Sequence, residues 1–149
     1  MIARVHLAAR RGAMPYLPEL HTEAETLSWI RDVVLPRQEV YVAVENGAIV
    51  GFVALDHDMV EQLYVGPAAQ SRGIGTELLD LAKELRAQGF RLWVFQRNEG
   101  ARRFYERRGL QLVELTNGAT NEEREPDALY EWRPTTPASR GRASPRAGP

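Results

Sequence analysis

The chain has 149 residues, 44% hydrophobic and 26% charged, which is the size and composition of one soluble folded domain with a single core. Its 19 basic and 20 acidic side chains give a net charge of −1, so no overall electrostatic preference for nucleic acid or an anionic membrane is expected. The sequence contains no cysteine, which excludes disulfides, thiolate metal sites and a cysteine nucleophile.

The remaining composition argues against a metal centre and a membrane location. Only His6, His21 and His57 offer ring nitrogens, and they lie far apart in the sequence. No stretch has the form of a secretory signal, and no apolar run approaches the ~18 residues of a membrane span. We therefore expect a cytoplasmic protein without a metal or a membrane partner.

The C-terminal segment differs in composition from the rest of the chain. Residues 134–149 contain four prolines, three arginines, no acid and no large apolar side chain, which is typical of a disordered tail. All 20 acids and 16 of the 19 bases precede it, so the predicted domain, residues 1–133, is mildly acidic.

The N-terminal third combines a β-like segment with a helix signal. Ile2–Arg10 is rich in Ile, Val and Leu and is predicted to be a strand. Gly12–Leu20 contains two prolines, which allow only a short or broken helix. Thr22 and Glu25 form a capping box, and apolar residues at spacings of three and four predict a helix from there to Pro36.

The middle of the chain predicts an antiparallel meander. Its three strands are Glu39–Glu45, Ala48–Leu55 and Met59–Val65. Asn46-Gly47 is the dipeptide best suited to a type I′ hairpin between the first two. His57-Asp58 makes the second tight turn.

The second half alternates helices and strands. It predicts a helix at Ile74–Leu85, a strand at Arg91–Arg97, a helix at Glu99–Arg108, and strands at Leu110–Leu115 and Asp127–Arg133. The whole order indicates an α/β protein of the α+β type, with a central mixed sheet and helices on its faces.

A glycine-rich turn lies where the meander gives way to the first long helix of this half. It runs from Gln70 to Thr76 and contains Arg72, Gly73 and Gly75. The free amides of a helix N-terminus attract anions, and glycine lets a ligand approach the backbone, so this turn is a candidate phosphate cradle. It lacks the Lys-Ser/Thr of a nucleotide P-loop and the third glycine of a dinucleotide fingerprint.

Two motifs resemble one known family. Leu63-Tyr64-Val65-Gly66-Pro67-x-x-Gln70-x-x-Gly73-x-Gly75-x-x-Leu78-Leu79 resembles the acetyl-CoA-binding motif of the GCN5-related N-acetyltransferases (GNAT). Asn98-x-x-Ala101-x-x-Phe104-Tyr105-Glu106-x-x-Gly109-Leu110 is similar to the second signature of that family, at the family's spacing. The resemblance covers about residues 39 to 133, and residues 1 to 38 match only in outline.

The resemblance implies a fold and a cofactor site. The sheet would splay between its fourth and fifth strands, Met59–Val65 and Arg91–Arg97, and the pantetheine arm of acetyl-CoA would enter there. Backbone amides from Ser71 to Thr76 would hold the pyrophosphate. The implied cofactor-binding residues are Leu63, Tyr64, Val65, Gln70, Ser71, Arg72, Gly73, Ile74, Gly75, Thr76, Asn98, Ala101, Phe104 and Tyr105.

The expected reaction is attack of a primary amine on the thioester. Tyr105 matches the tyrosine that faces the sulfur and can protonate the leaving thiolate. Glu61 lies two residues before Leu63, on the same strand face by alternation, and is the first candidate for the base. His57 and Asp58 are alternatives that would act through water. A backbone amide near Leu63 or Tyr64 would stabilise the thioester oxygen.

The acceptor is not identified beyond a small-molecule or peptide amine. Residues 121–127 hold four acids, which suit either a cationic acceptor or a solvated loop with Arg124 paired internally, and the loop is the commoner case. Trp93 and Phe95 share a strand face and either wall a pocket or join the core.

The sequence leaves two alternative functions open, and it also leaves open whether the protein forms a homodimer. The first rival is a non-catalytic acyl-CoA sensor, which would keep the cradle without a productive acceptor site. The second is an interaction protein that uses the sheet as a scaffold. A homodimer through an edge strand is also open, although no self-complementary patch is identified.

Overall fold

The structure is a computed structural model that describes residues 2–70 and 72–135. Within these residues a six-stranded mixed sheet has the order β1-β2-β3-β4-β6-β5. The strands are β1 (Glu39–Glu45), β2 (Ala48–Asp56), β3 (Met59–Val65), β4 (Phe90–Phe95), β5 (Gln111–Leu115) and β6 (Asp127–Trp132). The α-helices are α1 (Ile2–Ala13), α2 (Glu23–Trp29), α3 (Leu35–Arg37), α4 (Ile74–Leu85) and α5 (Glu99–Arg107).

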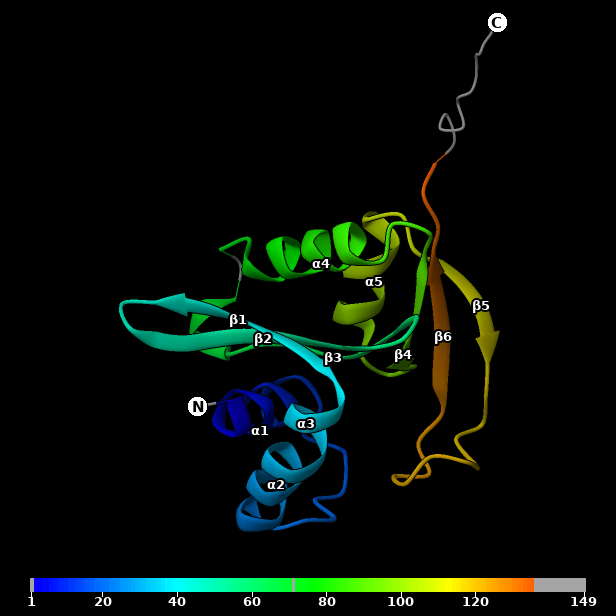
Figure 1. The fold of residues 1–149 in the computed structure, drawn as a ribbon. Coiled ribbons are helices and arrows are strands. Elements are labelled where there is room, and N and C mark those ends of the chain that lie inside the picture. The colour runs from blue at the N-terminus through cyan, green and yellow to red at the C-terminus, as the bar shows by residue number, and fades with distance from the viewer. Residues whose placement is uncertain (1, 71, 136–149) are drawn as a thin grey trace, which may run out of the picture.

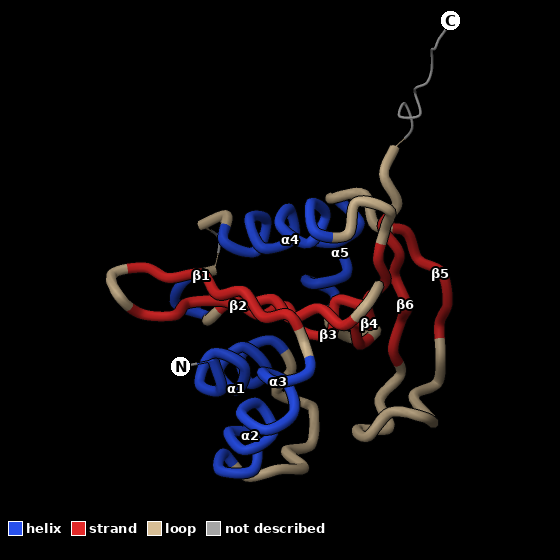
Figure 2. The backbone as a smooth tube through the Cα atoms, viewed as in Figure 1, coloured by secondary structure: helices blue, strands red, loops and turns tan. Residues whose placement is uncertain are grey.

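Helices cover the sheet on both faces, as Figures 1 and 2 show. The larger core cluster joins α4 and α5 to one face, where Leu79 and Ala82 pack with Val53 and Tyr130. On the other face a smaller cluster joins α1 and the turn before α3 to β2 through Ala54. The α/β class with a mixed sheet between helices is therefore confirmed.

The predicted meander is confirmed almost residue for residue. β1 pairs antiparallel with β2, and β2 with β3. Asn46 and Gly47 connect β1 and β2 with φ of 51° and 78°, the two positive values that a type I′ turn requires. The predicted helices and strands after residue 73 are also present, with ends that differ by one or two residues.

The first predicted element is wrong, because Ile2–Arg10 belongs to helix α1 and not to a strand. Ala3, Val5, His6 and Ala9 are buried, which is close to the three-and-four spacing of one helix face. The β-branched Ile2 and Val5 suggested a strand, but a helix period with alanine, leucine and arginine prevails. Because this first strand is absent, the strands predicted as the fourth and fifth of the sheet are β3 and β4.

The capping box at the start of α2 is confirmed in both directions. The Thr22 amide donates to Glu25 Oε1 at 2.8 Å, and the Glu25 amide donates to Thr22 Oγ1 at 3.1 Å. The helix continues through a π-helical turn, Ile30–Val34, and ends at Arg37. Pro36 has no backbone N–H, and in an α-helix its ring would clash with the carbonyl four residues earlier. We attribute the π-helical turn to this proline.

Two further predictions concern the ends of the folded part. Helix α1 ends at Ala13, and the residues up to 21 form turns and loop, as the two prolines indicate. The predicted tail, 134–149, lies outside the described residues except for Pro134 and Thr135. Among the described residues, no helix is long and apolar enough to cross a bilayer.

Candidate active site

A cleft of about 990 Å³ opens between β3 and β4. The two strands run parallel, and their pairing is confined to their first residues, where Met59 faces Arg91 and the Arg91 amide donates to Asp58 O at 2.9 Å. Beyond this point the cleft lies between the strands, with residues of α1, α4 and α5 in its walls. The predicted splay is therefore present at the predicted strand pair.

A β-bulge in β3 accompanies this divergence. Ala54 of β2 pairs with Gln62 and Leu55 pairs with Val60, which leaves Glu61 as the extra residue of β3. A bulge bends its strand and interrupts alternation, so alternation along β3 does not place Glu61 and Leu63 on one face. Glu61 nevertheless lines the cleft, with its side chain exposed.

One end of the cleft, which we call the α4 end, is formed by the start of α4 and by α5. Gly73 caps α4 with φ +81°, and the first intrahelical bond runs from the Glu77 amide to Gly73 O at 3.0 Å. The amides from Ile74 to Thr76 therefore have no acceptor within the helix. A Cβ on Gly73 would meet no described atom within 4 Å, so open space adjoins these amides and fits a phosphate.

The cation at the α4 end is not the predicted one. Arg72 turns away, donating to Glu45 Oε1 at 2.9 Å and to Ala68 O at 2.8 Å, and it does not line the cleft. Arg108 lines the cleft instead, donating to Thr76 Oγ1 at 2.9 Å and stacking 3.9 Å from the Phe104 ring. Sequence reasoning missed Arg108 because it occupies an unspecified position of the second signature, between Glu106 and Gly109, and approaches Thr76 only through the packing of α5 on α4.

Most of the other predicted cofactor residues line the cleft. Ser71 lies outside the described residues, and the buried Ile74 side chain belongs to the core, so only its amide is available. Asn98 caps α5 by accepting from the Ala101 amide at 3.3 Å. Those that line the cleft are Leu63, Tyr64, Val65, Gln70, Gly73, Gly75, Thr76, Asn98, Ala101, Phe104 and Tyr105.

Tyr105 and Tyr64 line the cleft from opposite elements, α5 and β3. Tyr105 is buried, and burial together with the neighbouring Tyr64 raises its pKa well above the usual value. Burial also raises the pKa of Tyr64, whose ring contacts His6 edge-on at 4.9 Å between centroids. Both phenols therefore keep their protons at neutral pH.

Glu61 differs from most acids near the cleft because no base of the described chain pairs with it. Partial burial raises its pKa, and the nearby Asp56 charge raises it further. The alternative bases His57 and Asp58 lie elsewhere, lining a separate cavity of about 620 Å³, and His57 Nδ1 lies 2.8 Å from Asp56 Oδ1.

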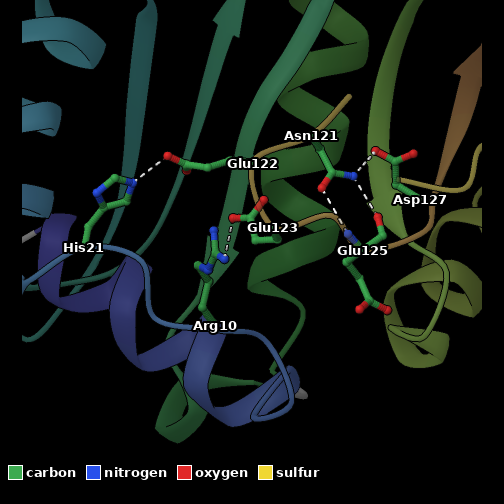
Figure 3. Close-up of polar contacts among 7 residues, drawn as sticks. All are labelled: Arg10, His21, Asn121, Glu122, Glu123, Glu125 and Asp127. Carbon is green, nitrogen blue, oxygen red and sulfur yellow. Dashed lines mark hydrogen bonds and ion pairs between the residues drawn. The ribbon is translucent and has the colours of Figure 1, made fainter. Parts of the chain in front are cut away.

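The opposite end of the cleft, which we call the α1 end, is formed by α1 and its following loop, the end of β4 and the loop between β5 and β6. Figure 3 shows two contacts between that loop and the N-terminal third: the ion pair of Arg10, in α1, with Glu123 at 2.9 Å, and a hydrogen bond at 2.8 Å between Glu122 and His21, which lies in the loop before α2. Glu125 pairs with Arg97 at 2.8 Å. The loop acids thus contact basic side chains of other elements. The expected pairing of Arg124 with an acid of the same loop does not occur among the described residues.

The described part of the chain contains no group of three His, Cys, Asp or Glu side chains that could hold a metal ion. The cleft thus brings together the free amides of a helix N-terminus, the phenols of Tyr64 and Tyr105, and two carboxylates, Glu61 and Asp127, that form no ion pair within the described residues.

Comparison with known proteins agrees with this arrangement. The family model described as "Acetyltransferase (GNAT) family" matches residues 7–110. The chain is similar to the Peptidyl-lysine N-acetyltransferase YiaC of Escherichia coli K12, with 28% identity over 121 residues covering 71% of this chain and 82% of the relative.

Solved structures share the fold. Apo YjaB from Escherichia coli aligns with a TM-score of 0.74 and 19% identity, over 90% of each chain. The PaiA N-acetyltransferase of Thermoplasma acidophilum, solved with coenzyme A, aligns with a TM-score of 0.64 and 19% identity, over 88% of this chain and 89% of that one. The chain belongs to the GNAT family and is an acyl-CoA-dependent N-acyltransferase with acetyl-CoA as its acyl donor.

Proposed function

We propose that the protein transfers an acetyl group from acetyl-CoA to a primary amine by direct attack on the thioester. The observation that carries this proposal is the single cleft that joins the free amides of α4 to Tyr105 and Glu61. A covalent cysteine intermediate is excluded, because the chain has no cysteine.

The α4 end suits the phosphates of the donor. The amides from Ile74 to Thr76 offer donors at the positive end of the helix dipole. Arg108 adds a fixed positive charge, since Thr76 and the Phe104 ring hold its guanidinium in place. Leu63 and Val65 line the cleft farther along β3 and suit the less polar pantetheine arm.

The proton transfers are assigned to two side chains. The amine must lose a proton to attack, and Glu61 accepts it directly or through water; its raised pKa makes it a better base than an ordinary carboxylate. The nitrogen–carbon bond forms, the carbon–sulfur bond breaks, and Tyr105 protonates the thiolate. The raised pKa of Tyr105 keeps that proton available at neutral pH.

Lysine side chains are the acceptors to test first. The support is that YiaC is named as a peptidyl-lysine N-acetyltransferase. Residues of α1, of β4 and of the β5–β6 loop line the α1 end, where the lysine side chain would lie.

The first experiment is a calorimetric titration with acetyl-CoA, with ATP as the control ligand. We expect micromolar binding of acetyl-CoA, near −8 kcal/mol, and much weaker binding of ATP. Thiol release from acetyl-CoA is then measured with and without primary amines, including lysine peptides. Amine-dependent release supports transfer, whereas binding without release for any amine would favour the sensor function.

The role of Glu61 is tested by the pH profile. A base must be unprotonated, so kcat/KM should fall as the pH drops through the raised pKa of Glu61. Glu61→Gln should lower kcat/KM by at least about tenfold and remove this acid limb. His57→Gln is the control and should keep the limb; a limb that persists in Glu61→Gln would assign the base elsewhere.

A further inference from the structure

The two ends of the cleft carry opposite charges. At the α4 end, three basic side chains of the α5 region line it: Arg103, Arg107 and Arg108. At the α1 end, the lining contains one carboxylate, Asp127, and no basic side chain among the described residues. The acceptor therefore meets an environment very different from that of the CoA phosphates.

The charge at the α1 end comes from Asp127 and not from the loop acids. Glu123 and Glu125 are each paired with an arginine at 2.9 Å or less, and Glu122 Oε2 lies 2.8 Å from His21 Nε2. Asp127 has neutral partners: it accepts from the Thr116 hydroxyl and, at 3.1 Å, from Asn121 Nδ2, as Figure 3 shows for Asn121. No ion pair to Asp127 forms within the described residues, so its negative charge is uncompensated.

The surrounding wall is apolar. Ala9, Ala13 and Met14 line it from α1 and the residue that follows, and Trp93 and Phe95 line it from β4. Trp93 is 46% exposed, which makes it a surface available for contact and not part of the core. The nearby bases Arg10 and Arg97 are committed to Glu123 and Glu125, and no basic side chain of the described residues lines this end of the cleft to pair with an acceptor carboxylate.

We propose that the acceptor is a cationic primary amine on an apolar stem, with no carboxylate next to the amine, and that Asp127 is the residue that selects it. This inference rests on the proposed function. Asp127 binds the ammonium group by a charge-assisted hydrogen bond, and Met14, Trp93 and Phe95 contact the stem. A carboxylate beside the amine is rejected because it would lie against an uncompensated negative charge without a partner.

The test compares two amines that differ only in that carboxylate, phenethylamine and phenylalanine, by thiol release from acetyl-CoA. We expect kcat/KM to be at least about tenfold higher for phenethylamine. Equal values, or a preference for phenylalanine, would overturn the proposal while leaving the transferase function intact. If no amine is acetylated although acetyl-CoA binds, the proposed function itself fails.

Variants separate the selecting residue from the fold. Asp127→Asn should raise the KM for phenethylamine about tenfold and leave the KM for acetyl-CoA unchanged. Glu114→Gln, on the exposed strand β5, is the matched control and should change neither. Trp93→Ala should raise the KM for phenethylamine more than that for methylamine. An unchanged amine KM in a folded Asp127→Asn would overturn the assignment.

Discussion

Tyr105 is the proton donor in the proposed reaction. Its phenol is buried beside Phe104, with ring centroids 5.2 Å apart. Tyr105→Phe keeps this packing and removes the proton donor, so we expect kcat to fall at least about tenfold with the acetyl-CoA Kd changed less than about twofold. Tyr41→Phe, on the exposed strand β1, is the control. An unchanged kcat would remove Tyr105 from the mechanism.

His6 makes the stability of the protein depend on pH. Burial, aided by the nearby Arg10 charge, lowers its pKa from 6.5 to about 4, so the unfolded chain binds the proton more tightly than the folded one. Stability is therefore full above pH 6.5 and is lost as the pH falls toward 4, by up to about 3 kcal/mol from this group.

Urea unfolding between pH 4 and pH 7 measures this loss. His6→Leu should flatten the dependence across that window, because the titrating group is gone and the site stays apolar. His57→Gln, whose ring is exposed, should leave the slope as it is. A slope that persists in His6→Leu would show that other groups produce it.

At the scale of single elements, the start of α4 depends on the left-handed backbone of Gly73. Gly47 in the β1–β2 hairpin is a matched control, because it has nearly the same φ, +78° against +81°, and a Cβ would meet nothing within 4 Å at either position. Alanine at either site should cost about 1 kcal/mol of unfolding free energy. Only Gly73→Ala should also weaken acetyl-CoA binding by calorimetry. Equal affinities in the two variants would contradict the cradle.

The elements also show where a sequence pattern is sufficient and where it is not. The hairpin at Asn46-Gly47 and the capping box at Thr22 follow from local chemistry, because each is completed by residues within a few positions. Ile2–Arg10 is predicted to be a strand but forms a helix, because short apolar runs fit both the helix and the strand period and only packing against the sheet selects one.

At the scale of the whole molecule, Arg10 and Glu123 join α1 to the β5–β6 loop across the α1 end of the cleft. Both side chains are mostly buried, at 25% and 13% exposed. Removing one charge leaves the other without its partner, so Arg10→Gln should cost about 1–3 kcal/mol. A double-mutant cycle with Glu123→Gln, followed by urea unfolding, should show coupling of about 1 kcal/mol. Additive effects would mean that the pair contributes nothing to stability.

The sequence by itself determined the meander, the α4 and α5 helices, the family resemblance and the positions of Gly73, Gly75 and Tyr105. These features are encoded by local periodicity and by motifs whose members are close along the chain. It also determined the β3–β4 strand pair at which the sheet opens, through the spacing of two motifs on either side of it.

Tertiary structure decided the features that depend on distant residues. The bulge at Glu61 appears only when β3 pairs with β2, so alternation along β3 alone does not decide which strand face Glu61 takes. Arg108 reaches the start of α4 through the packing of α5, whereas Arg72 is drawn to Glu45. Asp127 forms no ion pair within residues 2–70 and 72–135, because Arg10 and Arg97 pair with the loop acids Glu123 and Glu125. Charge balance in a folded site is a property of contacts in space, which composition and spacing do not specify.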